Sequence, residues 1–374
     1  MRIAVNTAFL PQEFSNDYII LLSRAFKCIS DIQQEHQFIF FSEKEQSHEL
    51  KSINNSEIYQ STSRKKNYLA LKYWYDVKIP ALLRKYKANV FFSPGGWCSS
   101  FTKLPQCILI NDPLFLQRPG LYTKKQLRYN NRQIGKSIHK AKKIITLSEV
   151  AKNIINQNFV VPTNKIETIY NGVQGNYQEI SDEAKEQVKL KHTEGKEFFL
   201  YIESFHPNGN LINLLKAFSL FKKRQESNFQ LIIYRRSVNG DPAFTKQLEK
   251  YKYRAHVKVI NKQDETEIDL LLSSAYAFIY PVFTDDFCFS ITSAMKIGAP
   301  VITSSHTAME EIAGDAALYV NPSEPQHIAD GMMRMYKDEK LRNELIKKGK
   351  AVAHNYTTEK TAERLWSVII SSFD

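Results

Sequence analysis

What this chain lacks narrows its class before any motif is considered. None of its apolar runs approaches the roughly 20 residues that a membrane-spanning helix needs. Residues 1–10 contain only a short apolar stretch, which predicts a first β-strand better than a signal peptide. A zinc site and a disulfide framework are unsupported, because there is no CxxC spacing and no nearby histidine pair around the four cysteines, Cys28, Cys98, Cys107 and Cys288. We therefore expect a cytoplasmic protein with reduced, mostly packed thiols and no metal site.

Acidic residues are scarce in one stretch of the N-terminal half. Residues 1–180 hold 25 basic and 13 acidic side chains, a surplus of 12 that equals the net charge of the whole chain, +12. Between Ser63 and Lys143 there are 18 basic residues and two acidic ones, Asp76 and Asp112, with aromatic side chains interleaved. Such a face fits an anionic membrane surface or a phosphate-bearing acceptor, but it also fits solvated helices. We expect no nucleic-acid partner, since no nucleic-acid motif accompanies the charge.

The length of the chain and the order of its apolar segments predict two domains. A chain of 374 residues exceeds the size at which a single core usually stops growing. Short strand-like runs alternate with helical patterns, which is typical of doubly wound α/β domains with parallel sheets. We expect one domain at 1–175, a polar linker at 176–195 and a second domain at 196–356, followed by a last helix at 357–374. The predicted strands are 3–5, 38–41, 90–92, 107–110, 143–146, 165–169, 198–202, 230–234, 257–260, 277–280, 301–303 and 317–320.

The tract FTDDFCFSITSAMKIGAPVIT, residues 283–303, is the most informative motif. A short acidic loop leads into a predicted helix at 290–297, Gly298 ends that helix, and an apolar strand follows. Unpaired N–H groups and the positive end of the helix dipole attract anions to such a helix start. The tract therefore predicts a site for a diphosphate, and with it the functional centre of the chain.

Several ordered phrases resemble the family 4 retaining glycosyltransferases, and together they cover nearly the whole chain. In the first half these phrases are FSP at 92–94, IND at 110–112, KKIITLSEVAKNII at 142–155 and IYNGV at 169–173. In the second half they are YIESFHPNGNLINLLKAF at 201–218, GAPVITSSHTAMEEIAGDAALYVNP at 298–322 and YTTEKTAERLWSVI at 356–369. The resemblance implies the GT-B fold, in which two Rossmann-like domains face a central cleft. The first would lie on the acceptor side, the second would bind a nucleotide sugar, and the last helix would cross back to the first.

This chain differs from the family at the centre of the donor motif. Family members usually place two glutamates eight positions apart, one near the donor sugar and one on the ribose; Asp285 and Ser293 stand there in this chain. Where the family has glycines between them, this chain has Asp286 and Cys288, and an added carboxylate repels a phosphate. The resemblance implies that Asp285 contacts the sugar and Ser293 the ribose. The turn residues that would hold the donor are Phe287, Cys288, Phe289 and Ser290.

Three further segments supply the other donor positions that the resemblance implies. Many family members carry a lysine that pairs with the diphosphate, and Asn208 and Gly209 stand in the corresponding phrase here. Arg235, after the predicted strand at 230–234, is a candidate for the missing positive charge. The residues that match the family positions near the donor sugar are Asn111 and Asp112. Glu311 matches the acidic residue in the helix behind the motif.

Two classes of function fit these residues. The first is a retaining glycosyltransferase that moves a sugar from a nucleotide sugar to a lipid-linked or oligosaccharide acceptor in surface glycan synthesis. It would need no metal or other cofactor, because protein cations and the helix start stabilise the departing diphosphate. It would work in the cytoplasm or at the inner face of the cell membrane. The second is a glycosyltransferase-like binding or scaffolding subunit without donor chemistry, since several donor positions have changed together.

Overall fold

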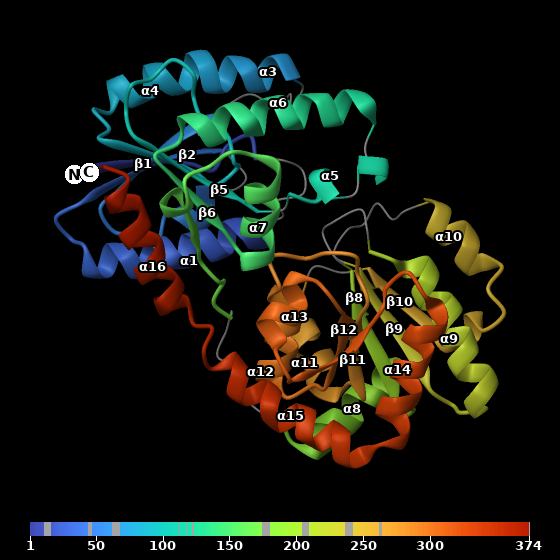
Figure 1. The fold of residues 1–374 in the computed structure, drawn as a ribbon. Helices are drawn as coiled ribbons and strands as arrows, with labels where there is room; N and C mark the ends of the chain where they lie inside the picture. The colour runs from blue at the N-terminus through green and yellow to red at the C-terminus, as the bar shows by residue number, and fades with distance from the viewer. Residues whose placement is uncertain are drawn as a thin grey trace. The chain divides into compact units, whose positions relative to one another are not determined.

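The chain forms two compact α/β units in the computed structural model (Figure 1). The first unit joins Met1–Gly172 to Thr357–Asp374, and the second unit is Val173–Tyr356. Among the described helices, none is long and apolar enough to span a bilayer. The structure describes residues 1–10, 16–43, 47–61, 68–111, 113–117, 119–121, 123–173, 180–203, 209–235, 242–261 and 264–373.

The sheet of the first unit consists of seven parallel strands: β1 (Arg2–Asn6), β2 (Gln37–Glu43), β3 (Ser56–Ser61), β4 (Val90–Ser93), β5 (Gln106–Ile110), β6 (Lys143–Thr146) and β7 (Ile166–Thr168). Their order is β3-β2-β1-β4-β5-β6-β7, so the chain winds outward from β1 in both directions. The predicted strands omit β3. Its sequence, SEIYQS, has few apolar residues because β3 lies at the sheet edge and is only partly buried.

Helices cover both faces of this sheet: α1 (Asn16–Ile32), α2 (Ser47–Leu50), α3 (Tyr68–Tyr73), a π-helical turn (Trp74–Lys78), α4 (Ile79–Lys85), α5 (Leu114–Gln117), α6 (Lys124–Lys140), α7 (Glu149–Asn158) and α16 (Thr358–Ser371). Figure 1 shows α1 and α16 on one face and α3, α4 and α6 on the other. Phe38 and Phe40 of β2 meet Phe26 of α1, with ring centroids 5.8 and 5.5 Å apart. Ile39 and Phe41 point the other way and pack in the core beneath α3 and α4. Burial on both faces explains why the predicted strands appear as continuous apolar runs.

Six parallel strands form the sheet of the second unit: β8 (Phe198–Ile202), β9 (Gln230–Arg235), β10 (Val257–Asn261), β11 (Ala277–Tyr280), β12 (Val301–Ser304) and β13 (Ala317–Val320). Their order is β10-β9-β8-β11-β12-β13. The sequence predicts all six strands, with bounds that differ from the structure by at most a residue. Two doubly wound parallel-sheet domains are therefore confirmed as the fold class.

The helices of the second unit are α8 (Asp182–Thr193), α9 (Leu211–Gln225), α10 (Pro242–Glu249), α11 (Glu265–Ser274), α12 (Phe289–Ile297), α13 (Ala308–Ala313), α14 (Pro325–Lys337) and α15 (Glu339–Ala353). Most of the polar segment predicted as a linker, 176–195, is helix α8. This helix packs on α11, where Lys191 Nζ lies 3.3 Å from Glu267 Oε1. It therefore belongs to the second unit.

Buried tyrosines connect the second sheet to the loops at its carboxyl edge. Tyr201, Tyr234 and Tyr280 lie on β8, β9 and β11 and are at most 1% exposed. A buried phenol needs a hydrogen-bond acceptor, and each finds one in a loop. These acceptors are the carbonyl of Gly209 at 2.5 Å, the carbonyl of Asp264 at 3.1 Å and the carboxylate of Asp285 at 2.9 Å.

Candidate functional site

A hydrogen-bonded loop joins β11 to α12 and is organised around Asp285. The Tyr280 hydroxyl donates to Asp285 Oδ2 at 2.9 Å. The N–H groups of Phe287 and Cys288 donate to Oδ1 at 3.0 and 3.2 Å. Both carboxylate oxygens therefore hold the turn from inside, and Asp285 is half-buried. Its contact with a donor sugar stays a prediction, whereas its role in shaping the loop is explicit.

Helix α12 begins at this loop with an N-cap residue in an unusual conformation. Cys288 has φ 52° and ψ 14°, in the left-handed region that a side chain other than glycine enters at a cost of about 1 kcal/mol. Its Sγ hydrogen-bonds to the Asp285 carbonyl at 2.9 Å. The N–H groups of Phe289, Ser290 and Ile291, in the first turn, have no hydrogen-bond partner among the described residues. The helix start therefore offers three donors and the positive end of its dipole to an anion.

Carboxylates surround this helix start. Burial raises the pKa of the Cys288 thiol well above its usual range, and Asp285, Asp286 and Glu311 each raise it further. Asp286 is only 4% exposed, and Glu311 is half-buried on α13. These carboxylates repel a phosphate, so an entering diphosphate depends on the backbone donors to offset that repulsion.

The structure brings most of the predicted donor residues to the beginning of α12, but it does not make all of them accessible. Phe287 is half-buried and contributes its N–H to Asp285. Ser290 is 9% exposed and Ser293 only 3% exposed. A ribose contact by the Ser293 hydroxyl therefore needs the ligand to reach an almost fully covered atom.

A neighbouring loop is attached to the same region by an asparagine that sequence reasoning missed. The Asn210 side-chain amide donates to the carbonyls of Pro281 and Pro322, both at 2.7 Å. Gly209 precedes it, and a Cβ at Gly209 would lie 2.7 Å from the Tyr201 hydroxyl oxygen. Gly209 and Asn210, which directly precede α9, are thereby fixed next to the loop after β11. Asn210 has φ 52°, and the tolerance of asparagine for this region was the available signal. Asn208 lies outside the described residues.

Arg235 is not a free cation, because the structure pairs it with Glu203. Its Nε donates to Glu203 Oε1 and Oε2 at 3.2 and 3.1 Å, and its terminal nitrogen donates to Oε1 at 3.0 Å. The two side chains are 6% and 19% exposed. The predicted role of Arg235 in replacing the missing diphosphate cation is therefore opposed by an internal carboxylate that already neutralises it.

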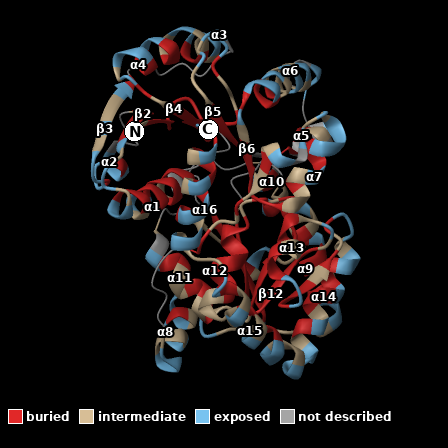
Figure 2. Cartoon of the chain, turned by 60° about the vertical axis from the view of Figure 1, so that its left-hand side comes forward, coloured by how far each residue is buried: buried red, intermediate tan, exposed pale blue. Residues whose placement is uncertain are grey.

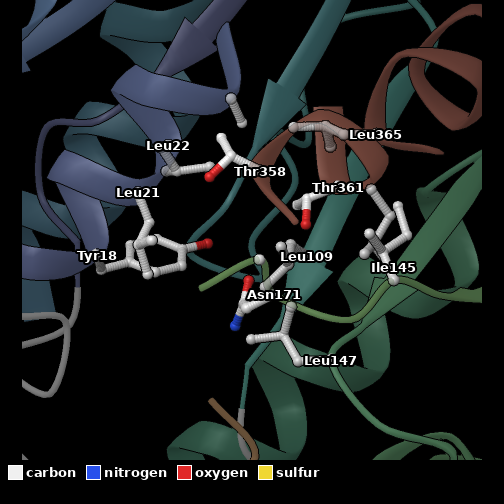
Figure 3. Close-up of a pocket in the computed structure, with 13 residues that line it drawn as sticks. Tyr18, Leu21, Leu22, Leu109, Ile145, Leu147, Asn171, Thr358, Thr361 and Leu365 are labelled. Carbon is white, nitrogen blue, oxygen red and sulfur yellow. The ribbon is translucent and has the colours of Figure 1, made fainter. Parts of the chain in front are cut away.

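In the first unit, Asn111 follows β5 and presents a buried amide oxygen. This Oδ1 has no hydrogen-bond partner among the described residues, and the adjacent Asp112 lies outside them. A cavity of about 30 Å³ lies elsewhere in this unit, and Figure 3 shows Tyr18, Asn171 and Thr361 at its wall among leucine and isoleucine side chains. That volume holds about one or two water molecules, so it is too small for a sugar. No group of three metal-ligating side chains occurs within the described part of the chain.

Family models of glycosyltransferases match both units. The family model described as "Glycosyl transferases group 1" matches residues 182–352, and the one described as "Glycosyltransferase Family 4" matches residues 32–175. O-antigen chain mannosyltransferase B of Escherichia coli is 24% identical over 279 residues, which are 74% of this chain and 73% of that protein.

Solved structures share the architecture of the whole chain. A glycosyltransferase from Rickettsia africae has a TM-score of 0.76 and 15% identity, over 100% of this chain and 98% of that one. HepE of Anabaena, solved in complex with UDP and glucose, has a TM-score of 0.76 and 16% identity over 100% of both chains. At these identities the likeness shows the fold alone.

Proposed function

Because this chain belongs to glycosyltransferase family 4 and has the GT-B fold, we propose that it transfers a sugar from a nucleotide sugar to a glycan or lipid-linked acceptor, with retention. The observation that carries this proposal is the start of α12, where the N–H groups of Phe289, Ser290 and Ile291 lack partners among the described residues. A nucleoside diphosphate is an anion of the kind that such a helix start binds.

In this proposal the protein stabilises the charge that develops on the departing diphosphate. The three backbone donors and the dipole of α12 face the leaving group, and no metal or other cofactor takes part. Asp285 fixes the turn before the helix through the N–H groups of Phe287 and Cys288. These backbone N–H groups are therefore in position before the nucleotide sugar binds, which lowers the reorganisation that the reaction requires.

We propose a glycan of the cell surface as the product, with the reaction taking place at the inner face of the membrane. The E. coli relative is an O-antigen chain mannosyltransferase, so mannose is the first sugar to test. HepE was solved with UDP and glucose, which supports a nucleotide sugar as the donor class. The basic surplus in residues 63–143, with 18 basic and two acidic residues, supports attraction to anionic lipid or to a phosphate-bearing acceptor.

Ser290→Asp tests the proposed diphosphate position, with Ser290→Asn as its matched control. Both substitutions add similar bulk at a residue that is 9% exposed, but only aspartate adds a negative charge in the first turn. A charge within a few ångströms of the phosphates should lower nucleoside diphosphate affinity at least about tenfold relative to the asparagine variant. Calorimetry with uridine, guanosine and adenosine diphosphates measures this. Equal affinity of the two variants would place the diphosphate elsewhere.

A second candidate function is favoured by the carboxylates around Cys288 and by the pairing of Arg235 with Glu203. Both features weaken an anion site, as expected of a glycosyltransferase-like binding or scaffolding subunit. Such a protein would bind none of the nucleoside diphosphates or their sugars at millimolar concentration. The same calorimetric panel therefore separates the two candidates.

A further inference from the structure

Four large apolar side chains on one part of the first unit are exposed to solvent. Leu69, Tyr73, Val77 and Phe101 are 73%, 57%, 53% and 68% exposed, and we call them the apolar patch. The other exposed large apolar side chains in the described part of the chain are scattered: Ile32, Val160, Leu190, Ile212 and Phe373. Single exposed apolar residues are ordinary, whereas a group of them marks an interaction surface.

Three members of the patch form a stripe along one continuous helical segment. Leu69 and Tyr73 lie on α3, and Val77 lies in the π-helical turn. Residues four positions apart are rotated by slightly more than one full turn in an α-helix and by slightly less than one in a π-helix. The two angular offsets partly cancel, so the three side chains stay in line. The opposite face of the segment, which includes Trp74 and Tyr75, is buried in the core. The segment is therefore apolar on its inner face and also along its outer stripe.

Hydrogen bonds of Ser100, the residue before Phe101, join the loop that carries Phe101 to the helical segment of the stripe and to α6. The N–H of Ser100 donates to Asp76 Oδ1 at 3.2 Å, and Asp76 directly precedes Val77. Lys140 Nζ, at the end of α6, donates to the Ser100 carbonyl at 2.5 Å. The loop that carries Phe101 is therefore held between the π-helical turn and the end of α6. Figure 2 shows exposed residues along α3, α4 and α6 and buried strands beneath them.

The surroundings of the apolar patch are strongly basic. Exposed cationic residues on the same elements and loops include Lys72, Arg84, Lys85, Lys103, Lys136 and Lys140. Asp76, one of the two acidic residues in 63–143, accepts the Ser100 hydrogen bond and is half-buried. Apolar side chains surrounded by lysine and arginine are the composition of a segment that lies in a membrane interface. A second copy of this chain fits the patch poorly, because pairing would bring two like-charged faces together.

We propose that the apolar patch inserts into the interface of an anionic phospholipid membrane while the surrounding lysines and arginines contact its headgroups. Leu69, Tyr73, Val77 and Phe101 provide the salt-resistant part of the attachment, and the cations provide the salt-sensitive part. The inference rests on the proposed location at a membrane surface and adds the residues that hold the protein there.

Vesicle flotation without donor or acceptor tests the inference. Wild type is expected to bind vesicles of equal phosphatidylglycerol and phosphatidylcholine, and part of that binding should survive 0.5 M NaCl, where exposed charges are screened beyond about 3 to 5 Å. The triple variant Leu69→Ser, Tyr73→Ser, Val77→Ser should bind at least about tenfold more weakly and lose its salt-resistant part. Ile32→Ser and Val160→Ser, at exposed apolar sites of the same unit, are the matched controls and should bind as wild type does.

The outcomes separate the insertion from the proposed location. Absence of wild-type binding at low salt would overturn both. Wild-type binding that the triple variant fully retains would overturn the insertion and leave the location standing. Sedimentation velocity of wild type and of the triple variant measures their oligomeric state. A dimer that the triple variant loses, with unchanged vesicle binding, would assign the patch to self-association instead.

Discussion

The Glu203–Arg235 pair makes a sharp prediction about stability. Glu203→Gln keeps the shape of the side chain but removes the negative charge that pairs with the Arg235 guanidinium, which is only 6% exposed. Three contacts of 3.0 to 3.2 Å join the two side chains. Hydrogen bonds to charged groups contribute about 1.5 to 3 kcal/mol, and Glu203 is 19% exposed, so water compensates in part. We expect the free energy of unfolding to fall by about 2 kcal/mol.

Urea unfolding of four proteins measures this value as a double-mutant cycle. The proteins are wild type, Glu203→Gln, Arg235→Met and the double variant, and the coupling energy should be about 2 kcal/mol. The matched control is Glu194→Gln, which breaks the exposed Glu194–Lys196 contact of 2.7 Å and should change nothing measurable. A coupling energy near zero would refute the conclusion that Glu203 neutralises Arg235. Under that conclusion, a nucleoside diphosphate gains no affinity from Arg235 unless Glu203 is removed.

Two further predictions concern single residues. Gly172→Ala should destabilise the first unit by about 1 to 3 kcal/mol, because its Cβ would lie 2.3 Å from the backbone of Thr357 and Thr358. Gly120→Ala has nothing within 4 Å of the new Cβ, and thermal unfolding of the two variants should differ accordingly. Burial, then Lys222 and Lys196, hold the pKa of His256 below its ordinary value of 6.5. Below pH 6.5 the unfolded chain takes up a proton that the native histidine resists, so stability should fall as pH drops through that value. His256→Asn should remove that part of the decline between pH 7.5 and 5.5, and an identical decline in both proteins would contradict it.

The sequence predicts the fold well because most strands of this protein are buried on both faces. Continuous apolar runs mark such strands, and in the second unit their bounds match those of the structure closely. Strand β3 is missing from the prediction because an edge strand needs few apolar residues. The segment around α8 is highly polar yet helical, because α8 is stabilised by capping at Ser181 and by contact with α11.

The candidate site is less predictable, because its contacts depend on the register between strands. Ile202 and Tyr234 are register partners in β8 and β9, which places the following residues, Glu203 and Arg235, side by side. Sequence separation hides this pairing. The bonds from Tyr280, Phe287 and Cys288 to Asp285 depend on the shape of a tight loop, which spacing alone does not specify. The sequence predicts where α12 lies in the motif, whereas only the structure shows which side chains are accessible to a ligand.

The start of α12 is the proposed binding site for the diphosphate of a nucleotide sugar. Calorimetric titration of the wild-type protein with the three nucleoside diphosphates, repeated on Ser290→Asp and Ser290→Asn, tests this binding site. We expect one nucleotide to bind wild type and the asparagine variant, and to bind the aspartate variant at least about tenfold more weakly. Absence of binding of every nucleotide to wild type at millimolar concentration would contradict it.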